Sequence, residues 1–169
     1  MTYERFEQLP VRQAAIKLGQ QIYTFTAKPA LRRQHSLRDQ IERAAVSVSN
    51  NIAEGFERGT TPELLTFLYI ARGSAGEVRS MPCLIEGIPE FAEHRSAGSP
   101  GLKSEISNLK LQAEGISRQL RAWADSLQNS GIRGQRYLTE KSRRQSSAKS
   151  GRDSFLAELA EIRRGKKSA

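Results

Sequence analysis

A helical apolar stripe in residues 37–59 constrains the fold of this 169-residue chain more than any other feature. Apolar residues recur there at steps of three and four, which places them on one side of an α-helix. These residues are Leu37, Ile41, Ala44, Ala45, Val48 and Ile52. Because a stripe of this kind has to be buried, the segment predicts a helix that packs against neighbouring elements.

A second, polar stripe runs along an adjoining side of the same helix. It carries arginines and short hydrogen-bonding groups, where a merely solvated face would more usually carry Lys and Glu. We predict that this stripe is a contact surface, which could be a polar network between helices, a subunit interface or a site for a small polar ligand. Its members, with one residue from the next helix, are Arg43, Ser47, Asn50, Asn51, Glu54, Arg58 and Arg72.

Helical spacing also predicts the first two helices of the chain. The first covers residues 3–27 and is limited by Pro29, because proline disfavours helical geometry in the residue before it. The second is the striped helix described above. It is expected to begin after Ser36, which with Asp39 resembles a capping box, and to end near residues 55–59, where two glycines provide an exit.

The third and fourth helices follow from a start signal and a heptad seam. Residues 60–63 combine a capping hydroxyl, an early proline and an acid, which favours a helix start. Pro82 is expected to kink or shorten this third helix, because an interior proline costs ~3 kcal/mol, and residues 86–101 are expected to fray into a loop. The fourth helix covers residues 102–127, with Trp123 on its seam in the core or between subunits.

These four segments predict an all-α fold, an antiparallel up-down-up-down four-helix bundle over residues 1–129. Gly73 and Gly76 are unusual within the third helix, since each glycine forfeits roughly 1 kcal/mol relative to alanine. We predict that they allow close packing against small residues of the second helix, with a pocket or an intersubunit contact as the alternative. Cys83 is expected to be a buried thiol.

Most of the net charge of +9 lies in the C-terminal part of the chain. Residues 130–169 hold 11 Lys and Arg against 4 Asp and Glu, whereas residues 1–129 hold 16 against 14. The composition of residues 130–169 predicts a basic, largely disordered tail with a short helix at 153–164. The tail could be a solubilising terminus or an arm that contacts phosphates. Candidate nucleic-acid contacts, where an aromatic ring is surrounded by positive charge, are Arg133, Arg136, Tyr137, Lys141, Arg143 and Arg144.

The sequence contains none of the motifs expected of a catalytic or metal-binding bundle. Cys83 is the single cysteine, and His35 and His94 stand apart, so neither a disulfide framework nor zinc spacing is present. There is no Glu-x-x-His pair for a di-metal centre and no Gly-rich phosphate loop. We expect no catalytic residues, cofactor or metal, and because no apolar stretch approaches ~20 residues, a cytoplasmic protein without a membrane span.

Three stretches of the chain resemble a known family. They are QIERAAVSVSNNIAEGFERGT, FLYIARGSAGEVRS and ISRQLRAWADSLQNSGIRGQRYLTEKSRR. The chain is similar over residues 6–144 to the bacterial four-helix-bundle proteins first noticed in intervening sequences of 23S rRNA genes. The resemblance implies an antiparallel bundle, a ring of five subunits and no established enzymatic activity. A more distant likeness in fold is to the accessory variability protein of diversity-generating retroelements, a basic pentamer associated with nucleic acid.

This chain departs from the family pattern in two ways. Its bundle portion is almost neutral, and Pro82, Gly87 and Pro89 interrupt a helix that the family usually keeps continuous. We therefore expect a non-catalytic, homo-oligomeric binding or scaffold protein whose partners are copies of itself, as a pentamer, and RNA or a nucleoprotein. The alternative is a protein–protein adaptor with no nucleic-acid role.

Overall fold

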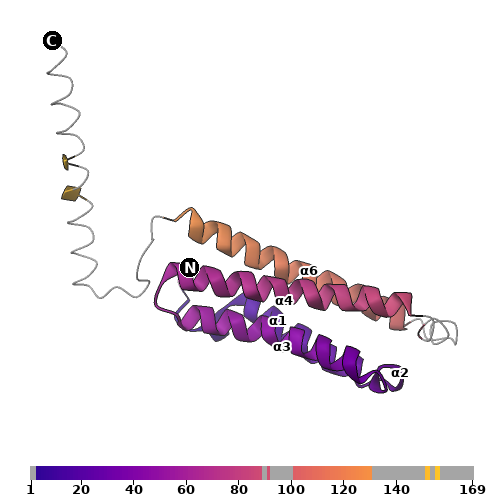
Figure 1. The fold of residues 1–169 in the computed structure, drawn as a ribbon. Helices are drawn as coiled ribbons and strands as arrows, with labels where there is room; N and C mark the ends of the chain where they lie inside the picture. The colour runs from indigo at the N-terminus through magenta and orange to yellow at the C-terminus, as the bar shows by residue number, and fades with distance from the viewer. Residues whose placement is uncertain (1–2, 89–90, 92–100, 131–150, 153–154, 157–169) are drawn as a thin grey trace, which may run out of the picture. The chain divides into compact units, whose positions relative to one another are not determined.

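The computed structural model describes residues 3–88, 91, 101–130, 151–152 and 155–156. The chain divides into two compact units, Met1–Gly134 and Gln135–Ala169. The elements of the first unit are η1 (Phe6–Gln8), α1 (Pro10–Thr26), α2 (Pro29–Arg32), α3 (His35–Glu57), α4 (Thr61–Gly87) and α6 (Gly101–Gln128) (Figure 1). No strand occurs among the described residues, and the all-α prediction is confirmed. Of the helix predicted at 153–164, only Phe155 and Leu156 are described, and both are helical.

Four long helices of the first unit form a bundle in which each helix has two neighbours. Around the bundle the order is α1, α3, α4 and α6, so the α1–α6 side lies opposite the α3–α4 side. Helices α4 and α6 run antiparallel, because Lys110 bonds to Glu86 near one end while Gln128 donates to the Tyr69 hydroxyl at 2.9 Å near the other. Short connections between long helices favour this arrangement.

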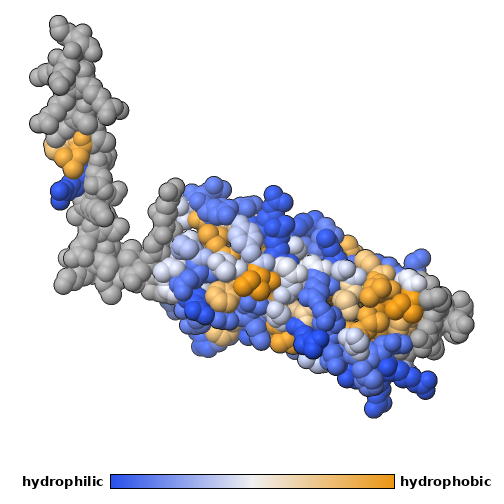
Figure 2. All heavy atoms as spheres, in the orientation of Figure 1, coloured by the Kyte–Doolittle hydropathy of each residue, from blue (hydrophilic) through white to orange (hydrophobic). Residues whose placement is uncertain are grey.

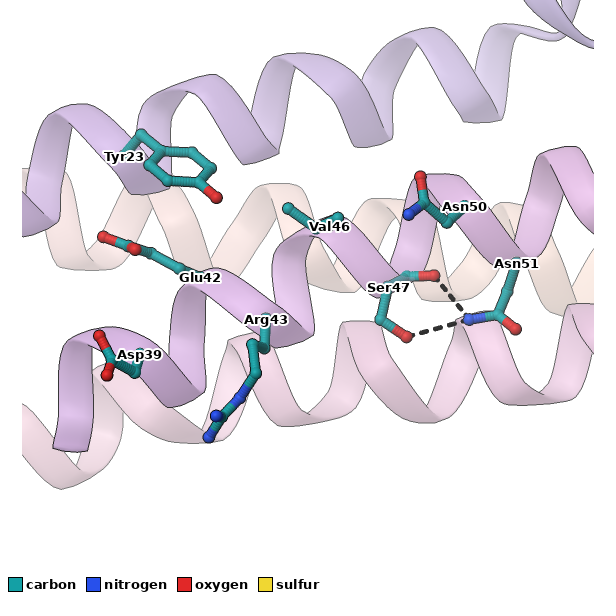
Figure 3. Close-up of a pocket in the computed structure, with 8 residues that line it drawn as sticks. All are labelled: Tyr23, Asp39, Glu42, Arg43, Val46, Ser47, Asn50 and Asn51. Atoms are coloured by element: carbon teal, nitrogen blue, oxygen red, sulfur yellow. Dashed lines mark hydrogen bonds between the residues drawn. The ribbon is translucent and has the colours of Figure 1, made fainter.

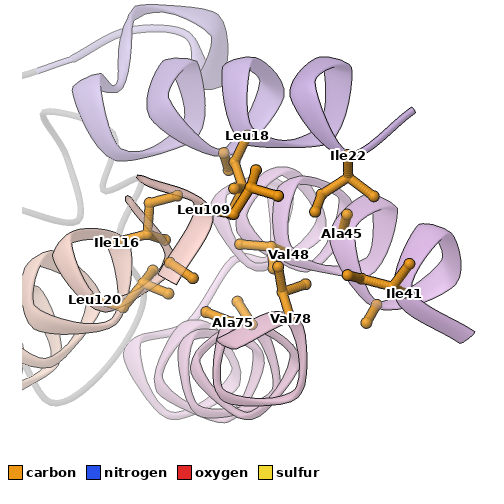
Figure 4. Close-up of a cluster of buried hydrophobic side chains, with 14 of the residues drawn as sticks. Leu18, Ile22, Ile41, Ala45, Val48, Ala75, Val78, Leu109, Ile116 and Leu120 are labelled. Carbon is orange, nitrogen blue, oxygen red and sulfur yellow. The ribbon is translucent and has the colours of Figure 1, made fainter. Parts of the chain in front are cut away.

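The four apolar stripes meet in one core (Figure 4). Buried side chains from all four helices include Leu18, Ile22, Ile41, Ala45, Val48, Ala75, Val78, Leu109, Ile116 and Leu120. The stripes predicted from spacing are therefore confirmed, except that Leu37, Trp123 and Leu127 are only partly buried and pack at the edge of the core. Burying a Leu or Ile side chain contributes ~1.5–3 kcal/mol, so this cluster supplies the main driving force for folding.

Helix α1 begins later than the spacing predicted. It starts at Pro10, not near residue 3, and Leu9 before it has extended backbone with φ −68° and ψ 119°. Residues Phe6–Gln8 form the separate 3-10 turn η1. Proline is favoured at the first helical position, because its missing N–H has no intrahelical acceptor there. The predicted start was wrong because apolar spacing alone does not register this preference of Pro10.

The start of α3 also differs from the prediction. Helix α3 begins at His35, and its N-cap is Gln34, with no side-chain capping bond. The capping box predicted from Ser36 and Asp39 is therefore wrong. Before it lies the short helix α2, which sequence reasoning did not predict and which Pro29 begins. The end of α3, at Glu57, falls within the predicted range.

Helix α4 starts as predicted and continues further than predicted. The Thr60 hydroxyl accepts a hydrogen bond from the backbone N–H of Glu63 at 3.4 Å. The helix runs through Pro82 to Gly87, so the predicted shortening at Pro82 is wrong. Pro82 is buried in line with the apolar stripe, and burial of its ring offsets part of the cost of the missing backbone bond. Most of the loop predicted for residues 86–101 lies outside the described residues.

The close approach between helices occurs at a different glycine from those predicted. A Cβ atom at Gly73 or Gly76 would meet no atom within 4 Å, so close packing of these two residues inside the bundle is wrong. At Gly55 in α3, a Cβ would lie 2.7 Å from Cβ of Phe67 and 3.2 Å from Cδ1 of Leu64, both in α4. Gly55 therefore sets how closely α3 approaches the first half of α4.

This contrast predicts opposite effects of alanine at the three glycines. Gly55→Ala should lower the free energy of unfolding by ~1–3 kcal/mol, because the added methyl group overpacks the α3–α4 contact. Gly73→Ala and Gly76→Ala should each raise it by ~0.5–1 kcal/mol, since alanine is the better helix former. Urea unfolding followed by circular dichroism measures all three. Equal destabilisation by all three substitutions would contradict the assignment of Gly55 as the close-approach residue.

Candidate functional site

The outer side of α3 carries an open pocket of about 590 Å³ (Figure 3). The ring of Tyr23 reaches from α1 toward Glu42 and Val46 on α3. Tyr23 and Val46 are 51% and 37% exposed, so this polar pocket has an apolar border. We call the set of lining residues the α3 surface: Tyr23, Asp39, Glu42, Arg43, Val46, Ser47, Asn50 and Asn51. It brings together four of the residues predicted from the polar stripe, which are Arg43, Ser47, Asn50 and Asn51.

A small hydrogen-bond network joins this surface to α4. The hydroxyls of Ser47 and Ser74 lie 2.9 Å apart across the α3–α4 contact. The side-chain amide of Asn51 donates to the backbone oxygen of Ser47 at 2.7 Å and to its hydroxyl at 3.0 Å (Figure 3). All three side chains are half-buried. Ser47 is therefore held by two partners, which fixes the polar floor of the α3 surface.

Glu54, in the last turn of α3, and Arg58, directly after it, lie at the end of the helix and do not line the pocket. The Arg58 guanidinium lies 2.5 Å from a Glu54 oxygen and 3.9 Å from a Glu63 oxygen. It also stacks over the ring of Phe67, 4.9 Å from the ring centre. These contacts give Arg58 a local role at the end of α3, next to the close approach at Gly55.

Arg72 is also separated from the α3 surface. It lies on α4 one turn after Tyr69, whose hydroxyl accepts from Gln128 of α6. Residues three apart share one side of a helix, so Arg72 lies on the same side of α4 as Tyr69, whereas Ser74 faces α3. Arg72 does not line the pocket, and its part in a polar network stays a prediction.

Sequence reasoning missed the apolar members of this region. Tyr23 and Val46 lie off the buried stripes of their helices, and so does Ile70, which is 46% exposed on α4. Ile70 also precedes Ser74 by one turn, and its backbone oxygen accepts from the Ser74 hydroxyl at 3.1 Å. The sequence did contain a signal for them: an aromatic or β-branched residue that lies outside the apolar stripe of its helix is expected to be exposed.

The α4–α6 side of the bundle holds the single cysteine. Cys83 is exposed, so the expectation of a buried thiol is wrong. The Lys110 ammonium bonds to Glu86, and this hydrogen bond is the main cause that raises the pKa of Lys110 above its ordinary value, with a smaller contribution from Cys83. The thiol is therefore accessible to reagents on a side of the bundle away from the α3 surface.

Membrane spans and metal sites are considered for the described part of the chain. No helix there is long and apolar enough to cross a bilayer, and no three His, Cys, Asp or Glu side chains gather as metal ligands would. The predicted nucleic-acid contacts fall outside the described residues; they are Arg133, Arg136, Tyr137, Lys141, Arg143 and Arg144.

The fold and this site define a four-helix-bundle protein with a polar surface bordered by exposed apolar residues. The family model described as 23S rRNA-intervening sequence protein matches residues 7–95. The match covers more than half of the chain, and the chain belongs to this family. It includes α1, α3 and α4 and stops before α6. No curated protein matches the chain.

The network at Ser47 predicts a measurable coupling between two helices. Ser47→Ala and Ser74→Ala should each lower the free energy of unfolding by about 1 kcal/mol, because each removes a half-buried hydrogen-bond partner. The effect of the double variant should be smaller than the sum, by ~0.5–1 kcal/mol, as expected for residues in direct contact. Chemical denaturation of the four proteins gives this coupling. Ser80→Ala, the same substitution at an exposed position of α4, serves as the control and should not lower stability; strict additivity would argue against the Ser47–Ser74 bond.

Proposed function

We propose that this protein is a non-catalytic, homo-oligomeric scaffold or binding protein of the cytoplasm, in which the α3 surface contacts a second copy. The observation that carries the proposal is the combination of a fixed polar floor with exposed apolar residues around it. Tyr23, Val46 and Ile70 together place apolar area beside the Ser47 network. Aromatic and aliphatic groups mixed with satisfied polar groups are typical of protein–protein interfaces.

The chemistry of the α3 surface favours contact over catalysis. Its one serine hydroxyl, on Ser47, is engaged by Ser74 and Asn51, and neither partner is a general base. The Tyr23 ring and Val46 lie at the border of the pocket, which is open to solvent. A nucleophile needs an adjacent base that is itself oriented, and this arrangement does not supply one. The proposal therefore assigns recognition, not reaction, to the site.

A ring of five is the assembly that the family resemblance supports. The chain mass of 18.9 kDa gives a simple measure of assembly, because a pentamer has five times this mass. A ring of five copies uses two different patches on each copy, so the α3 surface would be one half of the contact.

Self-association predicts a loss of assembly when the apolar border becomes charged. Val46→Glu combined with Ile70→Glu should convert the oligomer to a monomer of 18.9 kDa, since a buried unpaired carboxylate is costly. Light scattering at several concentrations measures the mass, and circular dichroism confirms that the helices remain. Ser80→Glu, at an exposed site on α4, is the matched control and should keep the parent mass. A wild-type chain that stays monomeric at high concentration would contradict the proposal.

We also propose that residues 130–169 bind RNA or a nucleoprotein. The supporting observation is their charge, with 11 Lys and Arg against 4 Asp and Glu. Cationic segments of this type bind phosphates without sequence preference, and their affinity falls with salt. A protein adaptor with no nucleic-acid role is the rival, and partner binding that survives nuclease treatment and high salt would favour it.

This second role predicts a salt-dependent interaction that maps to the tail. Replacing five tail cations with Gln should weaken binding to single-stranded RNA and reduce the slope of log affinity against log salt by ~0.7 for each phosphate that is no longer neutralised. The positions are Arg133, Arg136, Lys141, Arg143 and Arg144. Fluorescence anisotropy measures both quantities. A variant with Gln at Arg5, Arg33, Arg79 and Arg121, four exposed cations of residues 1–129, is the control; equal binding by the tail variant and the parent would refute the assignment.

A further inference from the structure

A second groove lies between α1 and α6, on the side of the bundle opposite the α3–α4 side. These two helices pack least closely of the four neighbouring pairs. Two pockets of about 210 Å³ and 480 Å³ lie along their contact and share Gln21 and Asn108, so they form one continuous groove. Its walls include the apolar residues Ala14, Phe25, Leu109 and Ile116 and the amides Gln21, Asn108, Gln112 and Gln119. We call this the α1–α6 groove.

The α1–α6 groove contains an unsatisfied hydrogen-bond acceptor. The side-chain oxygen of Gln21 is buried and has no partner among the described residues. A buried acceptor without a partner is unfavourable, and rotation of the Gln21 side chain toward the groove would let it accept from an incoming N–H donor. The groove ends at an ion pair between Lys28 and Glu105, which ties α6 to the residues that follow α1.

Charge is distributed unequally between the two sides of the bundle, although residues 1–129 are almost neutral. Helices α1 and α6 carry six Lys and Arg against three Asp and Glu, a net charge of +3. Helices α3 and α4 carry four Lys and Arg against seven Asp and Glu, a net charge of −3. Lys17, Lys103 and Arg118 on the cationic side form no ion pair with a described residue. Each copy thus presents opposite charges on opposite sides.

From these observations we infer that the α1–α6 groove of one copy receives the α3 surface of the next, so that copies associate head to tail. This inference rests on the proposed self-association and names its second surface. The α3 surface holds two carboxylates against one arginine, and the α1–α6 groove holds two lysines against one glutamate. Two α3 surfaces facing each other would bring like net charges together, which disfavours a symmetric contact. Opposite charges instead favour the head-to-tail contact, the kind that builds rings. Asn50, exposed on the α3 surface, carries the type of N–H donor that Gln21 lacks.

The space-filling view is consistent with a contact made by separate apolar groups among polar ones. On the face drawn in Figure 2, hydrophobic residues form separate groups on an otherwise hydrophilic surface. Exposed apolar residues of α3 and α4 include Val46, Ile70 and Leu84. Charge then sets the orientation of the two copies, while the apolar groups and the amide groove supply the short-range contacts.

Cysteine cross-linking between copies tests this orientation in the full chain. Two proteins are prepared in a Cys83→Ser background, one with Asn50→Cys on the α3 surface and one with Asn108→Cys in the groove. Both positions are exposed, so neither substitution disturbs the core. When the two proteins are mixed and treated with a short bismaleimide, the 50–108 product should form about tenfold faster than the 50–50 or 108–108 products, because like-charged contacts are disfavoured.

The native Cys83 supplies a matched control. It is exposed on the α4–α6 side, outside both surfaces, and the unmodified chain mixed with the Asn108→Cys protein should cross-link no faster than the like pairs. An oligomer that cross-links fastest through 50–50, or equally through every pair, would overturn the head-to-tail contact while leaving self-association intact. A monomer by light scattering, with slow cross-linking throughout, would overturn both.

Charge exchange gives a second and independent readout. Lys17→Glu with Arg118→Glu reverses the cationic side, and Asp39→Lys with Glu57→Lys reverses the anionic side. Each variant alone should shift the concentration at half-assembly upward by about tenfold, and an equal mixture of the two should restore the parent value, because opposite charges again face each other. Failure of the mixture to recover assembly would overturn the proposed contact. Circular dichroism of each variant confirms that the bundle stays folded.

Discussion

The close contact between α3 and α4 at Gly55 determines the arrangement on which the rest of the surface depends. Because no Cβ separates the two helices there, Phe67 and Leu64 pack directly on the α3 backbone. That approach fixes the register of α3 along α4, and the register in turn brings Ser47 to within 2.9 Å of Ser74. The polar floor of the α3 surface is thus a consequence of helix packing. A contact formed in the core of the bundle positions groups that lie at its border.

Much of this fold could be predicted from residue spacing, because apolar residues that recur every three or four positions mark the side of a helix that must be buried. The stripes of α1, α3, α4 and α6 were predicted for that reason. The starts of α1 and α3 were not, since Pro10 and His35 depend on local backbone conformations that periodicity does not encode. The glycines show the same limit. The sequence shows that Gly73 and Gly76 are unusual within a helix. Only the fold shows that, of these three glycines, it is Gly55 at which an added Cβ would meet a neighbouring helix.

The net charge of the bundle did not indicate how its charges are distributed over its surface. The near neutrality of residues 1–129 conceals a cationic α1–α6 side and an anionic α3–α4 side. The family match ends at residue 95, so α6 lies outside the matched region and the groove that it forms with α1 lies partly outside it. The α3 surface, in contrast, lies entirely within it. The α3–α4 side of the bundle therefore lies within the sequence that matches the family. The α1–α6 side also includes residues outside the match.

Pro82 has a consequence for how α4 comes apart. Without an N–H it cannot bond to the carbonyl of Val78, so the hydrogen-bond ladder is interrupted just before the final turn. That turn is held to the bundle mainly by the buried Ile85 and by the contact of Glu86 with Lys110. Local opening at this end can then stop at the interruption, leaving the residues that face Gly55 and Ser47 undisturbed. Pro82 therefore separates local opening at the C-terminal end of α4 from the α3 surface, which contacts the middle of the helix.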